Sequence, residues 1–132
     1  MDDAAWDYRG LVEAHAAADR STRARVRRLV GWILEDPARP RSIEELADRA
    51  AVSVRTLSRV FRSETGITPA TFVERSRVRL ARALLDETGL RIASVAARSG
   101  FASDEHMRRA FHRVLGTCPR RYASRGCGTM RR

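Results

Sequence analysis

Arginine is the residue type in this sequence whose number and spacing indicate a binding function. The chain has 132 residues, and all 26 of its basic residues are arginine, against 16 acidic residues, so the formal net charge is +10. Such a charge makes nucleic acid, an anionic membrane and an acidic protein candidate partners. The planar guanidinium group can donate two parallel hydrogen bonds to guanine O6 and N7, and each such pair gives about 1–3 kcal/mol of base discrimination.

Two short segments hold the side chains that we expect to contact base edges. These are Arg55, Ser58, Arg59, Asp104, Glu105, Arg108 and Arg109. The four arginines are the first candidates, and a solvated surface role or a phosphate contact is the alternative for each of them. For Arg59 and Arg109 a salt bridge within the protein is a further alternative. Asp104 and Glu105 could accept hydrogen bonds from a cytosine amino group. Alternatively, they could serve only to stabilise the helix, because acids interact favourably with the positive end of the helix dipole.

A second set of candidates lies where helices are expected to begin. Backbone N–H groups and the helix dipole attract anions at such positions, and flanking cations add to the attraction. The predicted phosphate contacts are Arg41, Ser42, Ser53, Arg91 and Ser103.

Catalytic and metal chemistry have no matching pattern in the sequence. It contains no Gly-rich phosphate loop, nucleophile elbow or zinc signature. Cys118, Cys127 and three scattered histidines are too few and too irregular for structural zinc, which needs four ligands at set spacings. We therefore expect no enzyme, no metal and no cofactor. A reactive thiol would indicate an enzyme, and we expect Cys118 to be inert.

The sequence gives no sign of a membrane segment or of export. No run of about 18 apolar residues occurs, and the chain starts with acidic residues where a signal peptide would be basic and then apolar. We expect a cytoplasmic protein with no membrane partner.

Helical periodicity predicts the elements that must position the candidate side chains. The first helix is expected to start at an N-cap, Ser21 or Thr22, and to stop at Asp36-Pro37. Trp32 on this helix is expected in the core rather than in a ligand site. The apolar stripe of the helix comprises Val26, Leu29, Val30, Ile33 and Leu34.

The next segment, 42–66, predicts a first helix-turn-helix unit. Ser42-Ile-Glu-Glu45 has the form of a capping box, a tight turn follows Ala50, and a further helix over 54–65 is closed by Gly66. A linking helix over 69–88, roughly 27 Å long, then starts with a proline. Its arginines are expected to be solvated or paired with acids of the same helix. The arginines are Arg75, Arg77, Arg79 and Arg82, and the acids are Glu74, Asp86 and Glu87.

The pattern returns after the linking helix and predicts a second unit over 92–122. A helix from Ile92 to Ser99, a turn at Gly100 and a helix over 103–115 are followed by a last short turn that starts at Cys118-Pro119. The two units with their helices make one domain, 21–123. Residues 1–20 have no assigned role, a remnant linker being one interpretation, and 124–132 are expected to be a disordered tail.

The two units form an internal repeat. At an offset of 49, Ile43, Leu46, Ala47, Arg49 and Val52 correspond to Ile92, Val95, Ala96, Arg98 and Phe101. At an offset of 50, Ser53, Leu57, Arg59, Phe61, Gly66, Pro69 and Phe72 correspond to Ser103, Met107, Arg109, Phe111, Gly116, Pro119 and Tyr122. One extra residue in the second turn explains the change of offset. Small, glycine, proline and aromatic positions recur in order, so the match exceeds shared helix composition.

These ordered residues resemble the AraC/XylS family over about 26–123. The resemblance is carried by Ile-Glu-Glu-Leu-Ala (43–47), Arg-Thr-Leu-Ser-Arg-Val-Phe (55–61), Arg-Leu-Ala-Arg-Ala-Leu-Leu (79–85), Ser-Gly-Phe (99–101), Arg-Arg-Ala-Phe (108–111) and Leu-Gly-Thr-Cys-Pro-Arg-Arg-Tyr (115–122). It implies an all-α, seven-helix module of two helix-turn-helix subdomains. Such a module places two recognition helices in adjacent major-groove segments of double-stranded DNA and regulates transcription, with RNA polymerase as an implied partner.

Two positions depart from the family pattern. Ala51 stands where the first turn often has glycine, so the backbone there must avoid positive φ or tolerate strain. Cys118 stands where serine is usual, which weakens the expected cap of the last helix. Many relatives also carry a separate effector-sensing or oligomerising domain. The 20 or so leading residues are too short for one, so a stand-alone regulator and a fragment of a longer protein are both open.

Two readings of function stay open at this point. The first is a sequence-specific DNA reader that binds as a monomer to an asymmetric bipartite site with its two heads about one DNA turn, roughly 34 Å, apart. In that reading a missing domain could still make it a dimer. The second is a protein-interaction module, or a fragment whose DNA binding needs a missing effector domain. RNA binding is less favoured because the aromatic residues fall at core positions.

Overall fold

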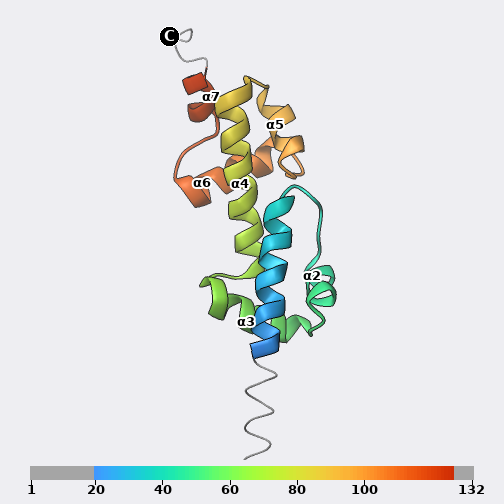
Figure 1. Ribbon diagram of the computed structural model, residues 1–132. Helices are drawn as coiled ribbons and strands as arrows, with labels where there is room; N and C mark the ends of the chain where they lie inside the picture. The colour runs from blue at the N-terminus through green and yellow to red at the C-terminus, as the bar shows by residue number, and fades with distance from the viewer. Residues whose placement is uncertain (1–19, 127–132) are drawn as a thin grey trace, which may run out of the picture. The chain divides into compact units, whose positions relative to one another are not determined.

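The computed structural model describes residues 20–126, and within them it contains seven helices and no strand. The expected all-α class is therefore confirmed. After a helix over 20–35, the elements are α2 (Ile43–Ala50), α3 (Val54–Thr65), α4 (Pro69–Thr88), α5 (Ile92–Arg98), α6 (Asp104–Leu115) and α7 (Arg120–Gly126) (Figure 1). The described residues form two compact units, 20–32 with 42–69 and 33–41 with 70–126.

The first unit is a helix-turn-helix built on local signals in the sequence. Ser42 caps α2 in the predicted capping box: its Oγ accepts from the Glu45 amide at 3.1 Å, and Glu45 accepts from the Ser42 amide at 3.0 Å. Apolar residues recur every three or four positions along each helix and are buried together. They are Val26, Leu29, Leu46, Ala47, Ala50, Leu57, Val60 and Phe61.

The second unit repeats this architecture around the C-terminal half of the linking helix. Figure 1 shows α5, α6 and α7 gathered around that half of α4. The buried cluster combines Val78, Ala81 and Leu85 of α4 with Val95, Ala96, Met107, Ala110 and Phe111. Tyr122 of α7 covers it, with its ring centroid 6.0 Å from that of Phe111.

The repeat is visible in the backbone of the two turns. The Val52 amide donates to the Ala47 carbonyl at 3.0 Å, and the equivalent Phe101 amide donates to the Ala96 carbonyl at 2.9 Å. The residue before each donor is left-handed: Ala51 has φ 59° and Gly100 has φ 90°. Equivalence at an offset of 49 therefore holds through Phe101. Ala102 is the extra residue, because Ser53 and Ser103 are the next matching N-caps.

Three sequence expectations about the helices are wrong. Residue 20 is already helical, so neither Ser21 nor Thr22 is the N-cap. A helix that has an apolar stripe can include both residues, because a hydroxyl side chain inside a helix costs only tenths of a kcal/mol. Leu34 is 48% exposed and does not join the buried stripe. Residues 124–126, expected in a disordered tail, belong to α7, since no residue before Gly126 breaks a helix. Residues 1–19, with Trp6, and 127–132 lie outside the described residues.

Arg75, Arg79 and Arg82 of the linking helix are exposed, as expected, but the expectations for Arg77 and for the partner of Glu74 are wrong. Arg77 instead donates to the backbone, from Nε to the Pro37 carbonyl at 2.8 Å and from Nη2 to the Arg39 carbonyl at 3.0 Å. Burial lowers the pKa of Arg77. Glu74 accepts from Arg113 of α6, with 2.5 Å between Nη2 and Oε2. All of these partners lie 38–40 residues away along the chain and replace the local ones. Arg82 also contacts a distant residue: its guanidinium carbon lies 4.8 Å from the centroid of the Tyr122 ring.

Candidate nucleic-acid interface

The outward face of α3 carries the predicted base-contacting residues of the first unit. Leu57, Val60 and Phe61 are buried, which turns Arg55, Ser58 and Arg59 to solvent, as expected. Among the described residues, neither Arg55 nor Arg59 forms an ion pair. The intramolecular salt bridge considered for Arg59 is therefore not seen. The guanidinium groups on this face keep their N–H donors available.

The outward face of α6 differs, because an acid there already holds two arginines. Glu105 Oε2 lies 2.5 Å from Arg108 Nη2 and 3.4 Å from Arg109 Nε, at i+3 and i+4. The hydrogen bond from Arg108 lowers the pKa of Glu105, and Glu105 in turn raises the pKa of Arg108. The salt bridge considered for Arg109 is present. Asp104 is exposed in the same first turn.

The serines predicted to contact phosphate are N-caps. Ser53 Oγ accepts from the Thr56 amide at 3.1 Å, and Ser103 Oγ accepts from the His106 amide at 3.2 Å. In each unit the serine also meets the side chain three residues on, Thr56 Oγ1 at 3.0 Å and His106 Nδ1 at 3.0 Å. The caps fix where α3 and α6 begin, and so the direction of the free N–H groups of their first turns.

The two arginines predicted to contact phosphate differ in their surroundings. Arg41 donates to backbone carbonyls of its own segment, from Nη2 to Asp36 at 2.6 Å and from Nη1 to Arg39 at 3.3 Å. Arg91 is exposed at the N-cap position of α5, where its side chain makes no capping hydrogen bond. Arg91 is thus the more available of the two for a phosphate.

The sequence predictions missed two pairs of residues on the same faces, all of them exposed except the half-buried Thr56. Thr56 and His106 occupy the first turns and match at the offset of 50 that relates Ser53 to Ser103. Arg62 and His112 extend the two faces by one helical turn and match in the same way. The repeat contained this signal for all four residues.

Other chemistry has little support within residues 20–126. No group of three or more metal-ligating side chains is found there. Cys118 is a half-buried free thiol. Among the described helices, none has the length and apolar character needed to cross a bilayer.

Known proteins have sequences similar to this chain. A family described as a helix-turn-helix domain matches residues 46–125. The HTH-type transcriptional regulator Rv1931c of Mycobacterium tuberculosis is 48% identical over 80 residues, which are 61% of this chain and 31% of the relative. A putative AraC-like transcription regulator of Streptomyces lividans is 40% identical over 87 residues, 66% of this chain and 29% of the relative. The chain belongs to the AraC family of transcriptional regulators.

A solved structure of a DNA-binding domain has the same fold. The DNA-binding domain of AdpA, a global transcriptional factor solved in complex with a target DNA, superposes with a TM-score of 0.74 at 35% identity, covering 80% of this chain and 95% of that domain. The chain spans about a third of the length of the two curated relatives. It matches the DNA-binding domain of AraC-family regulators.

Proposed function

We propose that this AraC-family domain reads two unlike segments of double-stranded DNA, one with α3 and one with α6. The observation that carries the proposal is a pair of outward faces at matching repeat positions with different chemistry. Arg55, Ser58 and Arg59 are donors without a partner among residues 20–126, whereas Glu105 binds Arg108 and Arg109. A recognition helix meets base edges with its N-terminal and central outward residues, where these side chains lie.

Base contacts and phosphate contacts divide between different parts of each unit. We assign base contacts to Arg55, Ser58, Arg59, Asp104, Glu105, Arg108 and Arg109, which all lie on exposed helix faces. We assign phosphate contacts to the helix starts at Ser42, Ser53 and Ser103 and to Arg91, with Arg41 as a weaker candidate because it is held by carbonyls. Phosphate contacts fix register, and base contacts specify sequence.

The domain binds as a monomer in this proposal, because the internal repeat already supplies two different heads. It assigns no catalytic role and no cofactor to the chain. A transcription regulator acts where DNA and RNA polymerase meet, so we place the protein in the cytoplasm and take RNA polymerase as its protein partner.

Two single variants test the division between the heads. Each variant, Arg59→Ala and Arg109→Ala, is measured on the preferred DNA site and on sites with single base changes in either half. Each should relax base preference in its own half only, at a cost of about 1–3 kcal/mol for a lost bidentate contact. Weakening that is uniform over all sites for both variants would show that these arginines bind phosphate, and the proposal would fail.

A further inference from the structure

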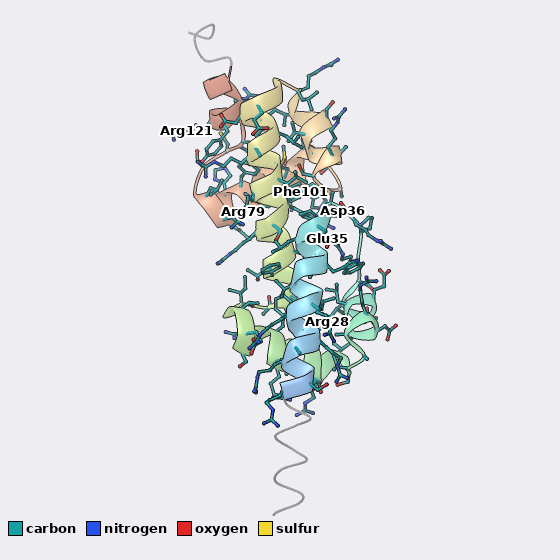
Figure 2. The ribbon with its side chains drawn as sticks, viewed as in Figure 1. Arg28, Glu35, Asp36, Arg79, Phe101 and Arg121 are labelled. Atoms are coloured by element: carbon teal, nitrogen blue, oxygen red, sulfur yellow. The ribbon has the colours of Figure 1, made fainter. Side chains whose placement is uncertain are left out.

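The first unit contains a cationic cleft away from the base-reading residues of α3. Its cavity of about 510 Å³ is lined by Arg25, Arg28, Leu29, Trp32 and Arg49. The first four lie at spacings of three, one and three along the helix over 20–35, so they share one face, and Arg49 comes from the last turn of α2. Arg28 lies part-way along that helix (Figure 2). Among residues 20–126, no acidic side chain lines the cleft.

The three positive charges of the cleft are not neutralised within the described residues. Arg25 Nε is buried without a hydrogen-bond partner, and Arg25 Nη2 makes only a 3.4 Å hydrogen bond to Thr22 Oγ1. Arg28 is exposed and takes part in no ion pair of residues 20–126. Glu64, which pairs with other arginines of the helix, is held by Arg27 at 2.8 Å and Arg23 at 3.9 Å.

Trp32 orients one of these cations. The Arg49 guanidinium carbon lies 3.9 Å from the centroid of the Trp32 ring. Stacking of this kind fixes the plane of a guanidinium and leaves its N–H edge free to donate. The cleft therefore offers the oriented guanidinium of Arg49, the buried unpaired Nε–H of Arg25 and the exposed Arg28 around a common space.

We propose that this cleft binds a phosphoryl oxyanion. A phosphate group offers several strong acceptor oxygens and carries one negative charge in the DNA backbone, or close to two as a monoester, and these oxygens match three guanidinium groups better than a single carboxylate does. The phosphate could belong to the DNA backbone or to a free phosphorylated small molecule. The site is independent of base reading by α3 and α6, so the proposed function can fail while this site stands.

The first experiment titrates inorganic phosphate, with chloride at equal ionic strength as reference. Binding is followed by NMR on the Trp32 indole N–H, which a Trp6→Phe variant distinguishes from the other tryptophan. The wild type should show saturable shifts, and Arg28→Ala should weaken binding by about tenfold, as expected for a lost charge-assisted hydrogen bond. Arg79→Ala removes the same charge from an exposed site on α4 in the other unit and should leave the affinity nearly unchanged (Figure 2).

A second experiment distinguishes the two sources of phosphate. If the cleft holds a DNA phosphate, Arg28→Ala should lower the slope of log affinity against log salt by about 0.9, and Arg79→Ala should not. If it holds a free phosphorylated molecule, that slope is unchanged and phosphate binds the DNA complex as it binds the free domain. The preferred DNA sequence should stay the same in either case. No saturable phosphate binding together with an unchanged salt slope would overturn the proposal, as would equal behaviour of the two variants.

Discussion

Glu105 is the residue that makes the two reading faces unlike. Its carboxylate takes hydrogen bonds from Arg108 and Arg109, the two arginines expected to read bases in the second unit. Arginines held this way have fewer free rotamers, so they meet DNA in a narrower set of orientations. The equivalent position in the first unit, at an offset of 50, is Arg55, and Glu64, the acid of α3, lies in its last turn.

Replacing Glu105 with glutamine should change base preference in the second half of the DNA site and leave the first half unchanged. The two ion pairs are replaced at most by hydrogen bonds to a neutral amide oxygen, which hold Arg108 and Arg109 less firmly. Affinities for sites with single base changes provide the measurement, and Glu44→Gln, an exposed acid in the first turn of α2, is the matched control. An identical base preference in Glu105→Gln and the wild type would show that the pairing has no role in recognition.

The same ion pairs predict a pH dependence. The pKa of Glu105 is lowered, chiefly by the hydrogen bond from Arg108, so the carboxylate is ionised at neutral pH and loses its charge only as pH falls through that lowered value. Glu105 should therefore add no pH dependence to base preference in the second half between neutral and mildly acidic pH. A change in that range that Glu105→Gln abolishes would contradict this assignment.

At the scale of elements, the two turns show one backbone conformation made with different residues. Ala51 and Gly100 are both left-handed. A Cβ at Gly100 would lie 2.6 Å from the Ala38 carbonyl oxygen, so this glycine is required by both conformation and space. Ala51 is exposed, so its side chain is not crowded, and only its left-handed backbone conformation costs free energy, about 1–2 kcal/mol. Of the two sequence alternatives for Ala51, tolerated strain is correct.

Three variants separate conformational strain from crowding. Ala51→Gly should stabilise the domain by about 1 kcal/mol, because it removes the strain of a left-handed alanine. The greater backbone entropy of glycine in the unfolded chain offsets part of this gain. Gly100→Ala should destabilise it by more than Gly116→Ala, since a Cβ at Gly116 would have nothing within 4 Å. Urea unfolding measures all three. Equal losses for the two alanine variants would show that the contact with Ala38 does not limit residue 100.

The elements whose signals are local could be predicted from the sequence. The capping box at Ser42, the closing glycines at 66 and 116 and the inward stripe of α3 depend on residues within one or two turns, and all are confirmed. The predictions failed where a side chain has its partner far away in the sequence. Arg77 binds carbonyls about 40 residues away, and Glu74 has acceptable partners on its own helix but pairs with Arg113. Local spacing cannot rank such choices.

For the candidate site, the sequence predicted which side chains face outward but not which are already engaged. The outward positions of α3 and α6 follow from periodicity and are confirmed as exposed. Glu105 pairs with Arg108 and Arg109 because of the side-chain rotamers of these residues. Arg41 donates to backbone carbonyls because of the geometry of its loop. The cationic cleft also escaped prediction, because Arg49 joins the helix over 20–35 only through folding.

At the scale of the whole molecule, the central feature is one chain with two helix-turn-helix units joined by α4. The 20 residues of α4 are about 30 Å of helix, close to the roughly 34 Å of one DNA turn. Because the two outward faces differ, a monomer should prefer an asymmetric site. The charge of +10 adds affinity for any DNA, so affinity alone does not test this claim.

Selection of binding sites from a random duplex pool, at physiological salt and with the protein as a monomer, tests the two-headed reading most directly. The account predicts two short, unlike blocks about one helical turn apart. Arg59→Ala should erase preference in one block and Arg109→Ala in the other. A single block, a two-fold palindrome, or salt-sensitive binding without any enriched sequence would contradict it.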